Sequence, residues 1–400
     1  MNKILLLLLI IILLCNIINS YNIINKIKTI TKTKKSIILK SSITSSDNII
    51  SNDVLSSFDY KKETKLPWIS NGYKSYKFNN YKINYVELGD KNKPSILLIH
   101  GFGASAYHWR YNIPILARDY HVYAIDLLGF GLSEKPIIEY NAEIWRDQTL
   151  SFIENVIYKE TGKSTVVAGN SLGGFTALYA ASNSDQYNKK LINGCILLNA
   201  AGIIYYHIIK YISSSSSSSL SSFSYNIILL LILSSIIGRF KQFSEDPSKL
   251  VPKPEWQEKI TAFIQRLIIS ISFIYTKQPA RIEQVLKQVY PVNPNMVDNE
   301  LVESIQFPAQ DPNAAEVFYR VIKRNGNGPM TFIDDLLDQL KMPLLLLWGV
   351  EDPWIRMTSC NMIKELYPKA SISNVNAGHC PHDEAPDVVN VEIDKFIKSL

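Results

Sequence analysis

The stretch 166–174 constrains this chain most, because it predicts a strand, a sharp turn and a helix in direct succession. An apolar run before Gly169 predicts the strand, and residues 175–181 predict the helix. Between them, Gly169 and Gly173 flank Ser171 in a Gly-x-Ser-x-Gly string. A Cβ at either glycine would clash where strand and helix close together. The turn would expose the Ser171 side chain near the positive end of a helix dipole, which predicts a nucleophilic serine.

Strands and helices alternate on both sides of this stretch. Apolar runs typical of parallel strands buried on both faces lie at 94–100, 121–126 and 343–349, and two more strands are predicted at 191–199 and 372–375. The aromatic-rich runs 73–78 and 81–88 are separated by two asparagines and predict a hairpin. Residues 143–160 predict an amphipathic helix. This alternation predicts an α/β chain with a mostly parallel, doubly wound sheet.

The alternation is lost over residues 203–339, which predicts a helical cap inserted between two halves of the sheet domain. Residues 255–275 and 278–290 are expected to be helical. The apolar run 227–237 is too short to span a bilayer, which takes about 20 residues, and is expected to form another cap helix. The serine run 213–219 predicts a disordered insertion. A cap this apolar indicates a hydrophobic substrate or a membrane-surface contact, although the same residues could simply form the cap's own core.

The N-terminal residues differ in composition from the rest. Seven of the 42 basic residues and none of the 36 acidic residues lie in 1–46, so the remainder is nearly neutral and shows no nucleic-acid signature. Residues 1–20 contain Lys3, an apolar run and small or polar residues, as in a secretory signal peptide. Residues 21–65 begin rich in Lys, Ser and Thr, as in a transit peptide or a disordered leader. Together they predict delivery to a plastid, with the secretory pathway or an uncleaved anchor as alternatives.

Two further candidate residues follow the last predicted strands. Asp352 lies just after the strand at 343–349, at the end where catalytic groups gather in open α/β sheets. His379 follows the strand at 372–375. In a triad with Ser171, the imidazole would accept the serine proton, and the carboxylate would fix the imidazole tautomer. The chain therefore offers a nucleophile, an acid and a base in the order Ser, Asp, His.

Four other residues are alternatives for these roles. Glu351 neighbours the acid, and His382 neighbours the base but is expected to belong to the start of the following helix. Asp126 ends a strand and is expected to cap its own loop. His100 is expected to shape the loop that follows it rather than to act as a base.

The strand–turn–helix motif and the Ser…Asp…His order closely resemble α/β-hydrolases. The resemblance implies a hydrolase core formed by residues 66–202 and 340–400, with the helical cap between them. It also implies an oxyanion hole made by the backbone N–H groups of Phe102, in the His-Gly-Phe-Gly loop, and of Leu172, which follows the nucleophile. Epoxide and haloalkane hydrolases of this fold use an aspartate nucleophile, which Ser171 argues against.

Further motifs closely resemble pheophytinases, plastid enzymes of plants and algae that remove phytol from pheophytin. The matching segments are 66–68, 100–105, 108–114, 169–174, 278–282, 311–320 and 378–384. The segments 278–282 and 311–320 are the specific part, because they lie in the predicted cap and the triad motifs belong to the whole superfamily. The resemblance implies hydrolysis of a phytylated tetrapyrrole in chlorophyll catabolism. Residues 203–240 depart from the family pattern, which leaves the pigment selectivity open.

Other activities remain open on the same scaffold: a general lipid esterase or carboxylesterase, a C–C bond hydrolase, or a non-catalytic binding protein. No metal or other cofactor is expected, because serine chemistry supplies its own nucleophile and no residues show metal-ligand spacing. The four cysteines are Cys15, Cys195, Cys360 and Cys380. They include no Cys-x-x-Cys pair and indicate no disulfide framework. The sequence does not determine the oligomeric state.

Overall fold

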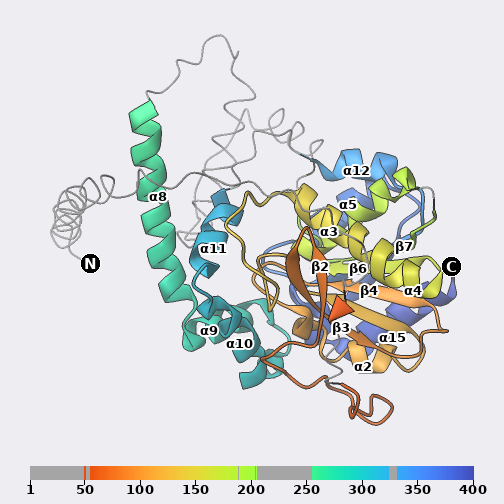
Figure 1. The fold of residues 1–400 in the computed structure, drawn as a ribbon. Helices are drawn as coiled ribbons and strands as arrows, with labels where there is room; N and C mark the ends of the chain where they lie inside the picture. The colour runs from red at the N-terminus through yellow and green to blue at the C-terminus, as the bar shows by residue number, and fades with distance from the viewer. Residues whose placement is uncertain (1–48, 51–54, 188, 203, 205–254, 324–330) are drawn as a thin grey trace, which may run out of the picture. The chain divides into compact units, whose positions relative to one another are not determined.

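A computed structural model describes residues 49–50, 55–187, 189–202, 204, 255–323 and 331–400. Within them, nine strands form one sheet in the order β1-β2-β3-β5-β4-β6-β7-β8-β9 (Figure 1). Strands β1, β2, β3 and β5 pair antiparallel, and the sheet is parallel from β5 through β4 to β9. The predicted mostly parallel α/β sheet is confirmed.

The strands follow the predicted runs closely. Their bounds are β1 (Ile49–Ile50), β2 (Lys74–Phe78), β3 (Tyr81–Leu88), β4 (Ser95–Ile99), β5 (His121–Ile125), β6 (Thr165–Asn170), β7 (Ile192–Leu198), β8 (Leu344–Gly349) and β9 (Ser371–Val375). Every residue of β4, β5, β6 and β8 is buried, as expected of parallel strands covered on both faces. β2 and β3 form the predicted hairpin, whose Asn79 and Asn80 both have positive φ.

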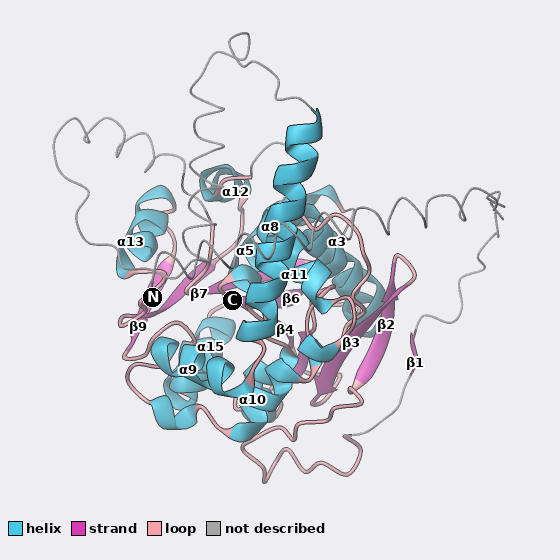
Figure 2. Cartoon of the chain, turned by 90° about the vertical axis from the view of Figure 1, so that its left-hand side faces the viewer, coloured by secondary structure: helices cyan, strands magenta, loops and turns pink. Residues whose placement is uncertain are grey.

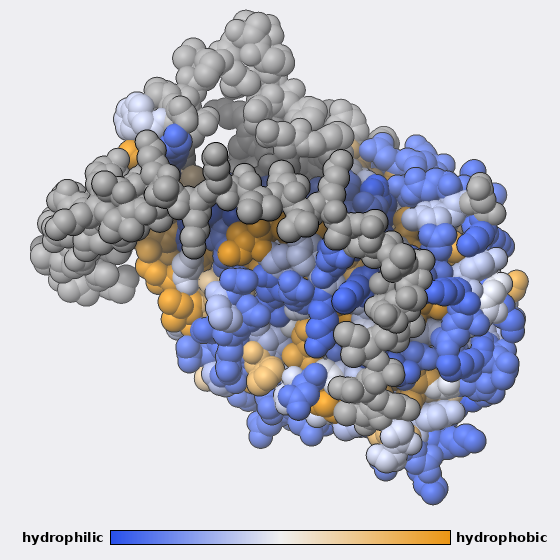
Figure 3. Space-filling view, in the orientation of Figure 1, coloured by the Kyte–Doolittle hydropathy of each residue, from blue (hydrophilic) through white to orange (hydrophobic). Residues whose placement is uncertain are grey.

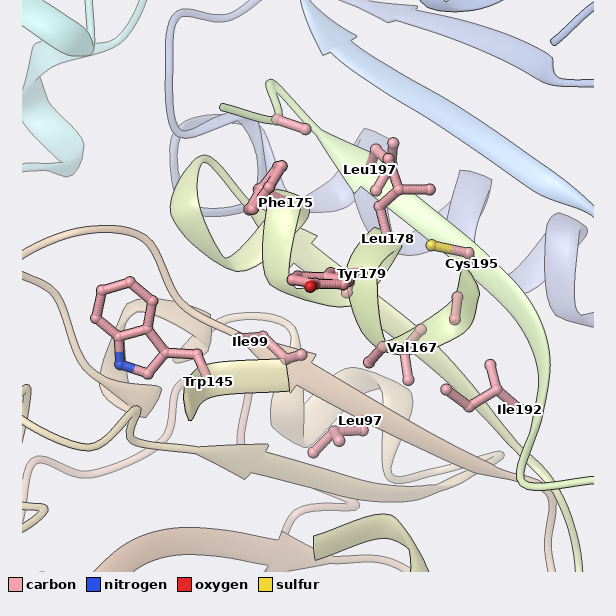
Figure 4. Packing of buried hydrophobic residues seen from close by; sticks show 14 of the residues in the cluster. Leu97, Ile99, Trp145, Val167, Phe175, Leu178, Tyr179, Ile192, Cys195 and Leu197 are labelled. Atoms are coloured by element: carbon pink, nitrogen blue, oxygen red, sulfur yellow. The ribbon is translucent and has the colours of Figure 1, made fainter. Parts of the chain in front are cut away.

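Helices cover both faces of the sheet. The short helices η1 (Ala106–Trp109) and α2 (Ile113–Leu116) lie on one face with α14 (Pro381–Glu384) and α15 (Pro386–Lys398). The other face is covered by α3 (Ala142–Phe152), α5 (Leu172–Asn183), α12 (Ile333–Gln339) and α13 (Met357–Leu366). Because side chains alternate along a strand, Leu97 and Ile99 pack with α3 and α5, while Ile96 and Leu98 pack with α2 and α15. Figure 4 shows the first of these two cores.

The predicted helix at 143–160 is present with an irregular middle. α3 begins after Asn141, whose side-chain oxygen accepts from the Ile144 amide at 3.0 Å. It continues as a π-helical segment, η2 (Ile153–Tyr158), and then as α4 (Lys159–Thr161). The helix ends at Gly162, whose φ of 65° is the left-handed conformation that glycine adopts at helix ends.

Between β7 and β8 the described chain is helical, as the expected cap requires. Its helices are α8 (Glu255–Thr276), α9 (Pro279–Val289), α10 (Asn299–Gln306) and α11 (Ala314–Lys323), followed by α12. α9 and α10 share a small apolar core, whereas α12 packs on α5, where Ser182 Oγ donates to Leu336 O at 2.7 Å. Figure 2 shows α8, α9, α10 and α11 on one side of the sheet. The segments 213–219 and 227–237 lie outside the described residues.

Residues 55–65, expected as the end of the leader, pack on the body. Leu55 is buried, and Arg118 donates hydrogen bonds to the carbonyls of Tyr60 and Glu63. Lys65 forms an ion pair with Asp298 at 2.9 Å, just before α10. The packed part of the chain therefore begins before residue 66. Residues 1–48, with the expected signal and transit segments, lie outside the described residues.

Candidate active site

Ser171 lies between the end of β6 and the start of α5, on the predicted sharp turn. Its φ of 54° and ψ of −117° are strained for a residue with a side chain. A Cβ on Gly169 would lie 2.1 Å from the Gly173 carbonyl oxygen, and one on Gly173 would lie 2.2 Å from that of Ile99. The Ser171 amide donates to Leu198 O at 3.0 Å, which anchors the turn to β7. The two glycines therefore allow the close approach that the sequence predicted.

Asp352 and His379 come together at the carboxyl ends of β8 and β9. Asp352 Oδ2 and His379 Nδ1 lie 2.7 Å apart in a hydrogen bond, and both residues are buried. Asp352 Oδ2 also accepts from Asn199 Nδ2 at 2.7 Å, and its Oδ1 accepts from the Trp354 amide at 2.7 Å. With three donors, the carboxylate is fixed in orientation. When His379 Nδ1 donates to it, Nε2 remains as the acceptor.

The loop that carries His379 is attached to the turn that carries Ser171. Asn170, immediately before Ser171, donates from Nδ2 to His379 O at 2.8 Å and to Leu198 O at 3.2 Å. From the cap side, the Val289 carbonyl at the end of α9 accepts the His379 amide at 3.0 Å. The imidazole is thus held from the sheet and from the cap, beside the residue that precedes the candidate nucleophile.

The loop after β4 lies against the same turn. A Cβ on Gly101 would lie 3.3 Å from Ser171 Cβ, so the predicted oxyanion loop and the serine are adjacent. Leu172 is the first residue of α5, and the first amides of a helix have no intrahelical acceptor. The Phe102 ring is 42 % exposed and contacts Phe130 and Phe318, with ring centroids 5.4 and 5.6 Å apart. Phe318 lies on α11, so the loop touches the cap.

His100 shapes this loop from inside, as expected. Its Nε2 accepts from the Leu127 amide at 3.0 Å, which places its proton on Nδ1, 2.7 Å from the Gly101 carbonyl oxygen. Burial lowers the pKa of His100. The ring is therefore a neutral bridge between two loops, with both nitrogens occupied.

The remaining alternatives also occupy other places. Asp126 accepts from the amides of Ala106 and Leu132 at 2.6 and 2.7 Å, so it caps loops as expected. The Glu351 side chain is exposed. His382 is buried within α14, with its ring 4.2 Å from that of Trp109. The hydrogen bond from His379 goes to Asp352 and not to Glu351.

Asn199 and Trp354 were missed by the sequence analysis. Asn199 follows β7, the strand beside β8, and lies at a φ of 41°. Besides contacting Asp352, its amide group exchanges hydrogen bonds with the backbone of Gly349. The sequence shows that Asn199 is a polar residue at the end of a buried strand. Its contact with Asp352 could not be predicted, because it depends on β7 and β8 being neighbours in the sheet.

A buried polar network behind His379 was also missed. Arg110 donates from Nε to Asp383 Oδ1 at 2.8 Å and from Nη1 to Asp298 Oδ1 at 2.5 Å, which joins α14 to the start of α10. Tyr290 OH donates to Asp383 Oδ2 at 2.8 Å and lies 2.6 Å from His108 Nε2. Burial lowers the pKa of His108 to about 3 and raises that of Tyr290. This network fixes the cap helices beside the loop of His379.

Among the described residues, one group brings potential metal ligands together. Glu87, His121 and Glu160 lie within reach of one ion, at the start of β5 and therefore at the opposite end of the parallel strands from Ser171. Lys74 pairs with Glu87 at 3.1 Å, and Lys91 pairs with Glu160. The lysines already compensate both carboxylates, so the arrangement is that of an ion-pair cluster.

Comparison with known proteins gives the same architecture. The sequence model of the Alpha/beta hydrolase family matches residues 96–392. Pheophytinase from Arabidopsis thaliana, described as chloroplastic, is 28 % identical over 358 residues. That match covers 80 % of this chain and 64 % of the relative, so the chain spans less than two thirds of that protein.

One further relative is similar over a shorter stretch, and one solved structure has a similar fold. The 2-hydroxy-6-oxo-6-(2'-aminophenyl)hexa-2,4-dienoic acid hydrolase of Metapseudomonas resinovorans is 41 % identical over 123 residues, covering 30 % of this chain and 39 % of that protein. The structure of a serine hydrolase involved in carbazole degradation superposes with a TM-score of 0.56 at 19 % identity, covering 80 % of this chain and 96 % of that one. The family match spans most of the chain and the fold agrees, so this protein belongs to the alpha/beta hydrolase family.

Proposed function

We propose that this protein is a serine esterase that removes phytol from pheophytin or a related chlorophyll pigment. The observation that carries the proposal is the similarity to Arabidopsis pheophytinase, which extends over 80 % of the chain and so includes cap residues as well as the hydrolase core. In this proposal Ser171 is the nucleophile, His379 the general base and acid, and Asp352 the residue that orients the imidazole. The hydrogen bond between His379 and Asp352 and the adjacent serine turn support these roles.

Acylation begins with attack of Ser171 Oγ on the ester carbonyl carbon, while His379 Nε2 accepts the serine proton. The bond from Oγ to carbon forms, and the carbonyl oxygen becomes an oxyanion. The backbone amides of Phe102 and Leu172 donate to that oxygen, which lowers the barrier because they are oriented before the charge develops. The carbon–oxygen bond to phytol then breaks, and the imidazolium returns its proton to the departing alkoxide, which leaves as phytol.

Deacylation repeats the sequence with water. His379 accepts a proton from the water, whose oxygen attacks the acyl carbon, and the bond to Ser171 breaks. The proton returns to Ser171, and the free carboxylic acid of the pigment is released. Asp352 keeps one tautomer of the imidazole through both halves, a function that Asn199 and the Trp354 amide support by fixing the carboxylate.

The substrate class is proposed from the cap. Phytol is a long branched alcohol, and each buried CH₂ contributes about 0.8 kcal/mol to binding. Phe102, Phe130 and Phe318 provide apolar surface where the oxyanion loop meets α11. A plastid location is proposed on two grounds, the leader composition and the chloroplastic description of the Arabidopsis relative.

A C–C bond hydrolase is the second candidate. It is favoured by the 41 % identity to the Metapseudomonas enzyme, although that match covers only 30 % of this chain. The same triad would then act on a carbon–carbon bond beside a carbonyl group. A 2-hydroxy-6-oxo-dienoate substrate distinguishes the two proposals, because its colour disappears on cleavage.

The test is incubation of the purified protein with pheophytin a, followed by chromatographic separation of the pigments. We expect pheophorbide and free phytol from the native protein and neither product from Ser171→Ala. Rapid cleavage of short p-nitrophenyl esters without any pheophorbide would favour the general esterase instead. Cleavage of the dienoate alone would favour the C–C bond hydrolase.

A further inference from the structure

Helix α8 turns its most apolar face away from the other helices and strands that the structure describes. At about 100° per residue, one face of the helix carries the half-buried Leu267 and six exposed residues that we call the outward stripe. They are Trp256, Ile260, Ile264, Ile271, Ile274 and Tyr275, and each is between 42 % and 63 % exposed. Ile269 and Phe273 occupy the inward side and are buried. Figure 3 shows hydrophobic residues gathered at the left, where Figure 1 shows the C-terminal part of α8.

A basic hollow lies along one border of the outward stripe, between α8 and α11. This cavity has a volume of about 340 Å³. Its lining includes Lys259 and Arg266 from α8, Arg320 and Lys323 from α11, Phe263, and the acidic residue Glu139. Glu316 accepts from Arg266 at 2.8 Å and from Arg320 at 2.7 Å, so part of the positive charge is compensated. Arg320 also lies 3.9 Å from Glu139. By composition, the lining has four basic residues and one acidic residue.

These two features together describe a helix suited to a lipid interface. An interfacial helix combines an apolar face, basic residues beside it, and aromatic residues at the depth of the headgroups. The outward stripe has Trp256 near its beginning and Tyr275 at its end, and no charged residue belongs to it. Within the described part of the chain, no helix is long and apolar enough to cross a membrane.

We propose that α8 docks this protein on the surface of a lipid bilayer that contains anionic lipids. The outward stripe inserts among the acyl chains, and the basic hollow receives a negatively charged headgroup. A second protein copy or another protein would also cover apolar residues, but the cations on the border favour an anionic surface. The docking does not depend on the reaction catalysed.

An aromatic connection links this face to the candidate active site. Phe273, on the inward side of α8, packs against Phe318 of α11 with ring centroids 5.1 Å apart. Phe318 in turn contacts Phe102 on the oxyanion loop at 5.6 Å. If the proposed ester hydrolysis holds, docking through α8 brings the loop beside Ser171 near the bilayer that contains a hydrophobic substrate. This consequence rests on the proposed function, whereas the docking does not.

Vesicle sedimentation of the full-length protein tests the docking. The vesicles are phosphatidylcholine with phosphatidylglycerol, and phosphatidylcholine alone. We expect the double variant Ile264→Asp/Ile271→Asp to bind at least roughly tenfold more weakly than the native protein. The matched control is Val388→Asp/Val391→Asp, two similarly exposed apolar residues on α15, which should bind as the native protein does. The N-terminal apolar run is present in all three proteins, so the difference between them reports on α8.

Two further experiments test the role of the basic residues and the depth to which Trp256 inserts in the bilayer. Lys259→Gln/Lys323→Gln should lose affinity for the anionic vesicles by roughly fivefold for each charge removed. Brominated lipid should quench the fluorescence of the native protein, and Trp256→Phe should remove that quenched component while Trp354→Phe retains it. Equal sedimentation of the α8 double variant and the native protein would overturn the proposal. So would concentration-dependent dimers, or a Trp256 that lipid never quenches because another segment of the chain covers it.

Turnover of p-nitrophenyl acetate distinguishes a failure of the docking proposal from a failure of the proposed esterase function. The α8 double variant should keep native turnover while losing vesicle binding, which shows that its core is folded. A native protein that binds vesicles through α8 but cleaves no ester would overturn only the proposed function.

Discussion

Helices α5 and α8 are both rich in apolar residues, but α5 is almost entirely buried and α8 exposes most of its apolar residues. In α5, every residue from Gly173 to Ser182 is buried between the sheet and the helices α3 and α12. In α8, Ile269 and Phe273 are buried, while the outward stripe is exposed. Burial of α5 holds the serine turn in its strained conformation, whereas exposure of α8 leaves an apolar surface without a protein partner among the described residues.

The difference shows what hydrophobicity can predict. An apolar sequence reports that a residue gains free energy on leaving water, at about 25 cal/mol for each Å² buried. It does not report which surface the apolar residue will pack against. For α5 that surface is the sheet, because Gly169 and Gly173 bring helix and strand together. For α8 we propose a bilayer. Substitutions at both places test the contrast between the buried end of the sheet that carries Ser171 and the exposed helix.

The largest effect is expected at the serine turn. Ser171→Ala should lower kcat for ester hydrolysis by up to about 10⁶-fold, the value of a complete triad acting as a unit. Ile271→Asp, on the outward stripe, should leave the turnover of a soluble ester unchanged. Parallel kinetic assays with a p-nitrophenyl ester measure both. Near-native turnover by Ser171→Ala would remove the catalytic role from this end of the sheet.

The next effect concerns Asp352, the proposed acid of the triad. Asp352→Asn should lower kcat by roughly 10⁴-fold, because the amide favours the wrong imidazole tautomer. Glu351→Gln is the matched control, since its neighbouring side chain is exposed and should be dispensable. Steady-state kinetics of both variants decide the assignment, which fails if Glu351→Gln is the more damaging change.

Substitutions in α5 and in α8 should have different effects on the free energy of unfolding. Leu178→Ala, in the buried part of α5, should lower the free energy of unfolding by about 2–5 kcal/mol, because it leaves a cavity. Ile264→Ala, on the outward stripe, should change it by less than about 0.5 kcal/mol. Urea unfolding followed by circular dichroism, without lipid, measures both values. A large loss for Ile264→Ala would mean that protein, and not lipid, covers α8.

Low pH should destabilise the buried polar network that contains His108. Burial lowers the pKa of His108 to about 3, so between roughly pH 6.5 and 3 the unfolded chain binds a proton that the folded chain does not. The stability that neutral His108 contributes is therefore complete above pH 6.5 and declines as the pH falls. We expect His108 alone to account for a loss of about 2 kcal/mol between pH 7 and 5. His100 and His382, whose pKa values burial also lowers, should add to the total loss measured by urea unfolding. His108→Gln should show a smaller loss, and an unchanged loss would exclude His108 as its source.

No effect is expected from metal removal. The Glu87–His121–Glu160 cluster is compensated by lysines and lies at the end of the strands away from Ser171. EDTA should leave ester turnover unchanged in the native protein. Lost activity that zinc or magnesium restores would show that a metal belongs to the reaction.

Much of the core and the order of the candidate site could be predicted from local patterns. The strands end within a residue or two of the predicted runs. For β4, β5, β6 and β8 the reason is that parallel strands covered by helices on both faces need apolar residues on both faces. The residues of the serine turn were predictable because a steric rule at Gly169 and Gly173 acts over a few residues. The cap helices at 255–275 and 278–290 were also predictable, because helical periodicity is a local pattern in the sequence.

The chain by itself therefore determined the buried strands, the serine turn and the positions of Asp352 and His379 after β8 and β9. Only the tertiary structure decided that Asn199 would reach Asp352, that Arg110 would join Asp383 to Asp298, and that α8 would face outward. The physical reason is the distance along the sequence over which each interaction acts. Backbone sterics and apolar periodicity act between neighbours in the sequence, whereas hydrogen-bond partners and the covering of a helix face depend on which distant segments the strand order brings together.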